Sequence, residues 1–441
     1  MEKAERLNRI KLFRKIINAN LSEIADFRNT DFSEPFNLRE ILLSTSGKYR
    51  SIRKHLDWLA IDHEKDIYPE AQENTFDFQC VIFKKEVNLC DSTFNNRVDF
   101  SYSSFLKSIS FNSVKFEDDA NFLYCEFTDE LNFGRTTVLK NASFFSSQMH
   151  GKTSFTNTKF HGTANLFLVQ FFKGINARHI VFNDTVNFHR SGYFQLADFR
   201  QCLFNKASNY AYSIFHAGAD FKQCQFIESA NFTGVTFKEE AEFSNSIFQD
   251  RLFLHEMKYT NNTNLNFEQC SIKDGHLVFA SIIPSGCFKS RSTAHLFKYA
   301  TFYKKDSITE MEYRVREMEL YNKELKWTNR KDIENKVVLF FNNISNKYGT
   351  KWLRGVLFTA LSAFFFLILI LFFGSNSDIG SLDVWIKGYI GTLNIFNFSD
   401  DVAGQEGVKL TALGTIIWFF SKIFVSYGIY QTVAAFRKHG K

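Results

Sequence analysis

The fold is decided by a run of aromatic repeats, and residues 111–133 show its pattern: they read FNSVKFEDDANFLYCEFTDELNF. Phe recurs there at alternating steps of five and six residues. The same rule, followed from Phe78 to Phe248, gives 32 positions, of which 25 are Phe. An α-helix has a period of 3.6 residues and a flat strand a period of two, so neither fits these steps. A chain that turns a corner every five or six residues does fit.

Two further features accompany the Phe residues. The residue two places before each Phe is mostly small, as are Ala120 and Cys125, and the residue directly before every second Phe is often Asn or Asp, as are Asn121 and Asn132. Four sides of alternating length close a coil of 22 residues, with Phe along the axis and polar residues facing water. Each coil then stacks on the next at the spacing of β-strands. The 32 positions predict eight such coils.

This repeat resembles the pentapeptide-repeat family, whose unit is A-(D/N)-L/F-x-x. The segments Ala120-Asn121-Phe122, Ala219-Asp220-Phe221 and Ala230-Asn231-Phe232 match the unit directly. The resemblance implies a right-handed quadrilateral β-helix, a solenoid that we expect over residues 76–302. Every second unit departs from the family pattern by one extra residue, and we expect a corner or a bulge to absorb it.

The segments that flank the repeat have a different character. Residues 1–75 predict a helical N-terminal cap, which would cover the open end of the β-helix and keep its edge from aggregating. Residues 303–350 are charged and periodic, and predict a helical connector. Met311, Val315 and Met318 form an apolar stripe on this connector, which is either a seam between subunits or a surface that packs on the end of the rod.

The C-terminal domain, residues 351–441, carries two apolar segments. Residues 355–374 contain no charge and are long enough to cross the hydrocarbon core as a helix. Residues 410–436 form a second apolar stretch, which only Lys422 interrupts. Positive residues precede the first segment and follow the second, whereas the loop between them is acidic, so both termini are expected in the cytoplasm. We therefore expect a multi-pass protein of the inner or plasma membrane with a cytoplasmic rod.

The loop between the apolar segments predicts a further element. Residues 382–400 begin with an apolar run that is too short for a third span, which a re-entrant loop would explain. Helix, re-entrant loop and helix together resemble the two-helix potassium-channel pore module. The resemblance implies filter or pore-lining residues at Thr392, Leu393, Asn394, Ile395, Phe396, Asn397, Phe398, Ser399 and Asp400. Asp401 is expected at the pore mouth, where it and Asp400 would concentrate cations as a ring of charge. Asn397 and Ser399 stand where the family has its filter glycines, so potassium selectivity is not carried over.

Lys422 lies near the middle of the second apolar segment, beyond the reach of either membrane surface. A charge at that depth is by default a functional hypothesis, and neither apolar segment contains an acidic residue to pair with it. Ser426 and Gly428 suit a water-lined or closely packed helix face, so these three residues are the candidates for the inner pore. A ring of lysines there would oppose cations, and the sign of the permeant ion stays open.

Composition argues against several other classes of protein. The 441 residues carry a net charge of only +6, and the seven Cys include no C-x-x-C, so we expect no nucleic-acid partner, no metal and no cofactor. No catalytic motif is present, so we expect no enzyme and no catalytic residue. The favoured interpretation is a pore-forming membrane protein, an ion channel for inorganic ions that assembles as a homotetramer and whose rod regulates or assembles it. The alternative is a membrane-anchored scaffold without a pore, which binds a protein partner through the rod surface.

Overall fold

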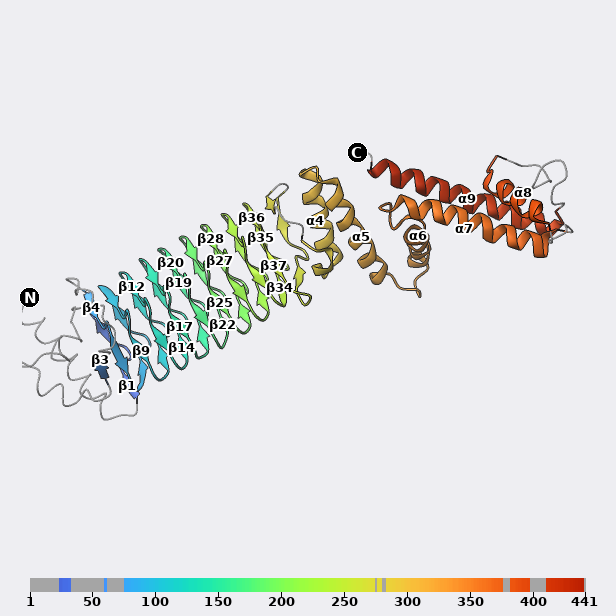
Figure 1. The fold of residues 1–441 in the computed structure, drawn as a ribbon. Coiled ribbons are helices and arrows are strands. Elements are labelled where there is room, and N and C mark those ends of the chain that lie inside the picture. Colours follow the sequence, from blue (N-terminus) through green and yellow to red (C-terminus); the bar gives the residue numbers. More distant parts are fainter. Residues whose placement is uncertain are drawn as a thin grey trace, which may run out of the picture. The chain divides into compact units, whose positions relative to one another are not determined.

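The computed structural model describes residues 24–32, 59–61, 75–273, 276–279, 283–375, 381–396 and 410–439. The chain forms two compact units, Met1–Thr293 and Ala294–Lys441. The first unit contains a β-solenoid of about nine turns, and helices follow it (Figure 1).

In the described part of the chain, four sheets of ten strands form the walls of the solenoid, and neighbouring strands are parallel except β3 and β5. Sheet A contains β1 (Ile24–Asp26), β6 (Glu86–Asn88), β10 (Ile109–Ser110), β14 (Leu131–Asn132), β18 (Thr153–Ser154), β22 (Ile175–Asn176), β26 (Ala197–Asp198), β30 (Ala219–Asp220), β34 (Glu240–Glu242) and β38 (Asn264–Asn266). Sheet B contains β2 (Asp31–Phe32), β7 (Thr93–Phe94), β11 (Lys115–Phe116), β15 (Thr137–Val138), β19 (Lys159–Phe160), β23 (Val181–Phe182), β27 (Leu203–Phe204), β31 (Gln225–Phe226), β35 (Ile247–Phe248) and β39 (Ser271–Ile272). Sheet C contains β4 (Thr75–Asp77), β8 (Arg97–Asp99), β12 (Ala120–Asn121), β16 (Ala142–Ser143), β20 (Ala164–Asn165), β24 (Val186–Asn187), β28 (Ser208–Asn209), β32 (Ala230–Asn231), β36 (Leu252–Phe253) and β40 (Leu277–Val278). Sheet D contains β3 (Leu59–Ile61), β5 (Val81–Phe83), β9 (Ser104–Phe105), β13 (Glu126–Phe127), β17 (Gln148–Met149), β21 (Gln170–Phe171), β25 (Gly192–Tyr193), β29 (Ile214–Phe215), β33 (Thr236–Phe237) and β37 (Lys258–Tyr259).

The coils stack with the predicted period of 22 residues. Ala120 pairs with Ala142, which pairs with Ala164, and the ring of Phe122 stacks on that of Phe144 with centroids 4.8 Å apart. The Phe side chains at the repeat positions are buried along the axis, which confirms the predicted Phe ladders. Their burial supplies much of the stability of the solenoid, since a fully buried Phe contributes roughly 1.5–3 kcal/mol.

Alternate corners of the coil differ, and this difference accommodates the extra residue. The five-residue side that follows Phe122 turns through Tyr124, whose φ of 53° is left-handed, and such residues recur every eleven positions from Asp91 to Gln223. The Asn or Asp before the Phe stabilises this turn: Asn132 Oδ1, for example, accepts the backbone N–H of Gly134 at 3.0 Å. The extra residue of the six-residue sides therefore lies at the intervening corners. A corner was one of the two ways, a corner or a bulge, in which the chain was expected to absorb it.

The small residues two places before the Phe residues hold neighbouring coils together. Ser213 Oγ donates a hydrogen bond to the backbone oxygen of Phe188 at 2.6 Å, and Cys224 Sγ donates to that of Phe199 at 2.9 Å. Burial raises the pKa of the Cys224 thiol, which makes it an unreactive thiol. Cys125, Cys202 and Cys224 are therefore small wall residues that resemble Ser213 in their role.

The solenoid loses its regularity at both ends. Phe237 pairs with Tyr259 at a spacing of 22 residues, but Glu240 pairs with Asn264 because two residues are inserted between these strands. The last strand is β40, and the predicted β-helix residues 291–302 lie in helix α4. The helical cap expected over residues 1–75 falls mostly outside the described residues. The strands described within this range are β1, β2, β3 and the start of β4.

Among the described residues, seven helical elements follow a short 3₁₀ turn, η2 (Ser285–Cys287). They are α4 (Arg291–Tyr303), α5 (Ser307–Glu324), α6 (Arg330–Asn346), α7 (Trp352–Leu369), η3 (Ile370–Gly374), α8 (Leu382–Leu393) and α9 (Ala412–His439). The stripe on the connector packs within the connector itself, because Val315 and Met318 of α5 cluster with Leu339 of α6 and with Tyr348. This packing gives the stripe a third partner that neither predicted alternative included.

Two tyrosines occupy axis positions that otherwise hold Phe. Tyr193 and Tyr210 are fully buried, and in the described part of the chain neither hydroxyl has a hydrogen-bond partner. An unsatisfied buried hydroxyl costs about 1–3 kcal/mol, so Tyr193→Phe and Tyr210→Phe are each expected to raise the melting temperature of the solenoid by at least about 2–4 °C. Thermal unfolding followed by circular dichroism measures this shift. The reverse change Phe215→Tyr should lower it, and destabilisation by either Tyr→Phe variant would contradict the assignment.

Candidate functional site

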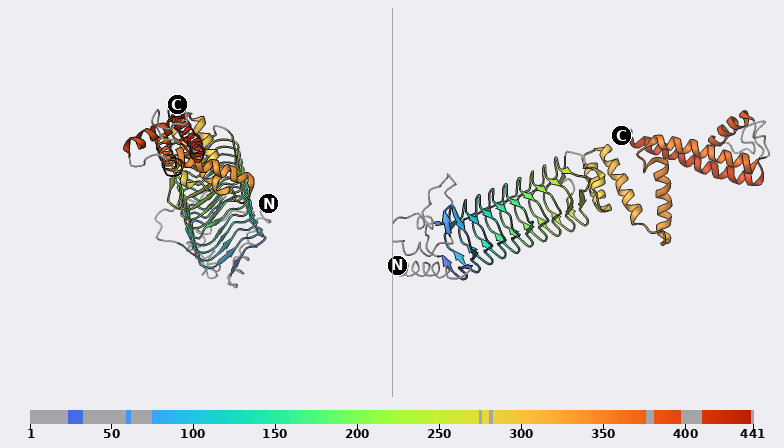
Figure 2. Two further views of the ribbon diagram at one scale, coloured as in Figure 1. Left: turned by 90° about the vertical axis from the view of Figure 1, so that its right-hand side faces the viewer. Right: turned by 60° about the horizontal axis from the view of Figure 1, so that its bottom comes forward.

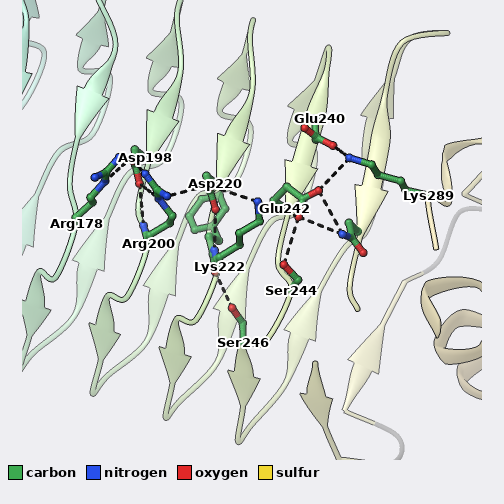
Figure 3. Close-up of polar contacts among 12 residues, drawn as sticks. Arg178, Asp198, Arg200, Asp220, Lys222, Glu240, Glu242, Ser244, Ser246 and Lys289 are labelled. Atoms are coloured by element: carbon green, nitrogen blue, oxygen red, sulfur yellow. Dashed lines mark hydrogen bonds and ion pairs between the residues drawn. The ribbon is translucent and has the colours of Figure 1, made fainter. Parts of the chain in front are cut away.

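A ladder of charged residues runs along sheet A across the later coils (Figure 3). Arg178 Nε lies 2.5 Å from Asp198 Oδ2, and Arg200 Nη2 lies 2.9 Å from the same oxygen. The ladder continues through the ion pairs Arg200–Asp220, Lys222–Asp220, Lys222–Glu242, Lys289–Glu242 and Lys289–Glu240. Acids and bases alternate along the strip, so successive coils attract one another and the ladder stabilises the stack.

The Asp198 carboxyl is expected to make the folded solenoid less stable in acid. Burial alone would raise its pKa, but hydrogen bonds from Arg200 and Arg178 outweigh burial and hold the pKa below its ordinary value. The carboxylate therefore stabilises the folded state above the ordinary Asp pKa of about 3.9, and this stability is lost as the pH falls through the lowered pKa. We expect Asp198→Asn to remove about 2 kcal/mol at pH 7 and to lower the melting temperature by about 4–8 °C.

The neighbouring Asp220 provides a matched control for this prediction. Burial raises the pKa of Asp220, so its charged form is less favoured in the folded state, and Asp220→Asn should cost less than Asp198→Asn at pH 7. Melting curves between about pH 7 and pH 3 should show the deficit of Asp198→Asn shrinking in acid. A deficit that stays constant over this range would exclude the carboxylate as its source.

Two helices of the second unit are long and apolar enough to cross a membrane. Trp352–Gly374 has a mean hydropathy of 2.8, and Ala412–Arg437 has a mean hydropathy of 1.5. Among the described residues, these are the two helical segments with the length and the apolar composition of a membrane span. The first contains the whole predicted segment 355–374, and the second contains the predicted segment 410–436 except for its first two residues. The two helices run side by side in Figure 1 and in the right-hand view of Figure 2.

Small residues bring α7 and α9 into close contact. A Cβ on Gly428 would collide with Thr359, and one on Gly355 would lie 2.5 Å from Thr432 Oγ1. Any side chain at either glycine would push the helices apart, as is typical of closely packed membrane helices. Gly428 therefore contributes to packing against α7.

The short helix α8 lies against the second half of α7. Tyr389 donates a hydrogen bond from its hydroxyl to the backbone oxygen of Ala360 at 3.2 Å, and Thr392 Oγ1 donates to that of Ala363 at 3.4 Å. Ala360 and Ala363 are near the middle of the apolar segment Trp352–Gly374. The last turn of α8 thus packs halfway along α7, although α8 follows the loop at the far end of that helix.

Lys422 of α9 reaches this last turn. Its Nζ donates to the backbone oxygens of Gly391 and Asn394, both at 2.7 Å, and lies 4.8 Å from the ring centroid of Trp418. The side chain is 6% exposed, so the ammonium is almost removed from solvent. Carbonyls at the C-terminal end of a helix carry partial negative charge, which a cation stabilises. Lys422 therefore caps α8 from a neighbouring helix.

The structure brings some of the predicted site residues together and separates others. Thr392 is buried beside α7, Asn394 accepts from Lys422, and Phe396 is 82% exposed at the end of the described segment. Leu393 and Ile395 are half-buried between them. Ser426 is exposed and Gly428 faces α7, so neither lies with Lys422. The remaining predicted residues lie outside the described part of the chain: Asn397, Phe398, Ser399, Asp400 and Asp401.

Hydrogen bonds between side chains also join helix α6 of the connector to α9, and the sequence did not predict them. Asn346 Nδ2 donates to Gln431 Oε1 at 2.5 Å, and Asn342 Oδ1 accepts from Tyr427 Oη at 2.9 Å and from Gln431 Nε2 at 3.0 Å. Asn346 is also the last residue of α6, which runs across the direction of α7 and α9 (Figure 2). The connector is therefore hydrogen-bonded to the second apolar helix as well as continuous with the first. The spacing of Asn342, Asn346 and Gln431 along the sequence gives no indication that these residues form hydrogen bonds with one another.

Comparison with known proteins identifies the repeat. A family model described as pentapeptide repeats (9 copies) matches residues 210–258. No curated protein matches the chain, and no solved structure matches it either. The chain therefore carries pentapeptide repeats on a β-solenoid, followed by helices of which two are suited to a membrane.

Proposed function

We propose that this protein forms an ion-conducting pore in a membrane, with α7 and α9 as spanning helices and α8 as a re-entrant helix between them. One observation carries the proposal, namely that Lys422 caps the end of α8 at the middle of α9. In the proposed topology the rod and both termini are cytoplasmic, and α8 enters the membrane from the opposite side. The charged flanks of the two helices support this orientation.

The position of the α8 terminus supports an aqueous lining. In a membrane, non-helical backbone at the depth of the hydrocarbon is tolerated only where protein covers it or where it faces water. The chain leaves the helix at Asn394, and Phe396 is largely exposed in the single chain. We propose that residues 392–400 line the pore and that several copies surround it. Two spanning helices cannot enclose water alone, and the potassium-channel resemblance makes four copies the proposed number.

The charges near the pore favour cations in this proposal. Asp400 and Asp401 would concentrate cations at the mouth as a ring of negative charge. The ammonium of Lys422 already bonds to two carbonyl oxygens with partial negative charge, so its repulsion of cations is partly compensated. The rod would then assemble or regulate the pore through the connector helices.

Recordings from planar bilayers that contain the purified full chain test the proposal. We expect a cation conductance that Asp400→Asn lowers. Asp383→Asn is the matched control, because Asp383 also lies between the two apolar helices, in the first turn of α8, but pairs with Lys387 at 2.6 Å. A protein that is monomeric in detergent and electrically silent would contradict the pore and favour the anchored scaffold. The scaffold would gain further support if a poly-Leu replacement of α9 left the biological activity intact.

A further inference from the structure

A cavity of about 570 Å³ opens within the second unit, between the connector helices and α9. Its walls are largely apolar and include Met318 of α5, Val337 and Phe341 of α6, and Ile423 and Phe424 of α9. Cavities of roughly 300–1,000 Å³ with apolar walls are typical of sites for small ligands. The cavity is separate from the contact between Lys422 and α8, because Lys422, Gly391 and Asn394 are not among the residues that line it.

The polar groups around the cavity leave one charge available. Asn342, Asn346, Tyr427 and Gln431 line it, and they bond to one another. Arg314 of α5 is the one charged side chain among the described residues that line the cavity, and no acidic residue of that set faces it. An apolar space with a single cation complements a molecule that has an apolar body and one negative head.

We propose that this cavity binds a long-chain fatty acid, with its acyl chain along α6 and α9 and its carboxylate on Arg314. A guanidinium binds a carboxylate through two parallel hydrogen bonds, which fits a carboxylic acid. The ligand touches α5, α6 and α9 together, so its binding stabilises the contact between the connector and α9. Its effect on conductance rests on the proposed pore, whereas its binding does not.

Photolabelling of the full chain in phosphatidylcholine nanodiscs tests the binding. The probe is a palmitic acid that carries a diazirine and an alkyne, and mass spectrometry locates its adducts. We expect adducts at cavity residues that excess palmitate removes and that methyl palmitate leaves in place. Arg314→Gln should weaken labelling about tenfold, the effect of losing about 1.4 kcal/mol, whereas Arg314→Lys should retain part of it.

Two further variants separate charge from shape. Val337→Trp places a large side chain at a position that is 43% exposed and lines the cavity, so it should block labelling without changing the charge. Arg316→Gln is the matched control on the same helix, because Arg316 does not line the cavity. Equal labelling of lipid-facing residues such as Leu361, equal competition by methyl palmitate, or cross-links between two copies at the cavity would each overturn the proposal.

Conductance separates this proposal from the proposed function. Palmitate is expected to change the conductance of the wild-type protein and to leave that of Val337→Trp unchanged. Specific labelling of an electrically silent protein would retain the fatty-acid site and remove the pore. A conducting protein without specific labelling would retain the pore and remove the site.

Discussion

Phe188→Asp or Phe232→Asp is expected to unfold the solenoid. Both rings are buried on the axis, and each stacks on Tyr210, at 4.7 Å and 4.8 Å between centroids. Removing a buried Phe costs about 3–5 kcal/mol, and an unpaired buried carboxylate adds about 3–5 kcal/mol. The sum is comparable to the whole stability of an ordinary domain, about 5–15 kcal/mol. Circular dichroism should show loss of the β signal and of the cooperative melting transition.

Phe194→Asp is the matched control for this prediction. Phe194 is one of the aromatic residues on the outside of the coil, 40% exposed, and stacks on His216 at 4.6 Å. An Asp there stays in water, so the variant should fold with a small change in melting temperature. If the two single variants Phe188→Asp and Phe232→Asp both melted normally, the assignment of these residues to the axis would be refuted.

The sequence predicted the solenoid well because its order is local and repeated. A coil of 22 residues places Ala120 on Ala142 wherever the pattern holds, so one rule fixes most of the strand register. The two inserted residues before Asn264 broke that rule, and no local signal shows how the coil accommodates an insertion. The left-handed corners were also missed, because Tyr124 and Leu168 are not residues that favour a positive φ.

The contacts of the second unit were less predictable, because they join residues that are far apart in the chain. Hydropathy located both apolar helices, and it singled out Lys422 as a charge without an acidic partner. Its actual partners are the backbone oxygens of Gly391 and Asn394. Every residue has a backbone oxygen, so the sequence cannot indicate which of them Lys422 contacts. The bond between Asn346 and Gln431 spans 85 residues and likewise depends on how the helices pack.

Lys422→Met is expected to release α8 from the two apolar helices. Met has a similar length but no ammonium, so the oxygens of Gly391 and Asn394 lose a charged donor in apolar surroundings. Each unsatisfied carbonyl costs about 1–3 kcal/mol, and a loss of about 3 kcal/mol raises local opening roughly a hundredfold. Hydrogen exchange of the α8 amides in nanodiscs should accelerate accordingly, while that of α7 changes little.

Two comparisons distinguish an anchor from a charge in the pore. Lys387→Met removes a lysine from α8 itself, where it is half exposed and pairs with Asp383, so α8 exchange should change by less than about threefold. Lys422→Arg keeps the positive charge and should preserve most of the protection of α8. If Lys422 is the anchor, Lys422→Met destabilises the conducting state and reduces the current. A larger cation conductance with unchanged α8 exchange would instead show that the ammonium faces the permeating ions and that the bonds to α8 are dispensable.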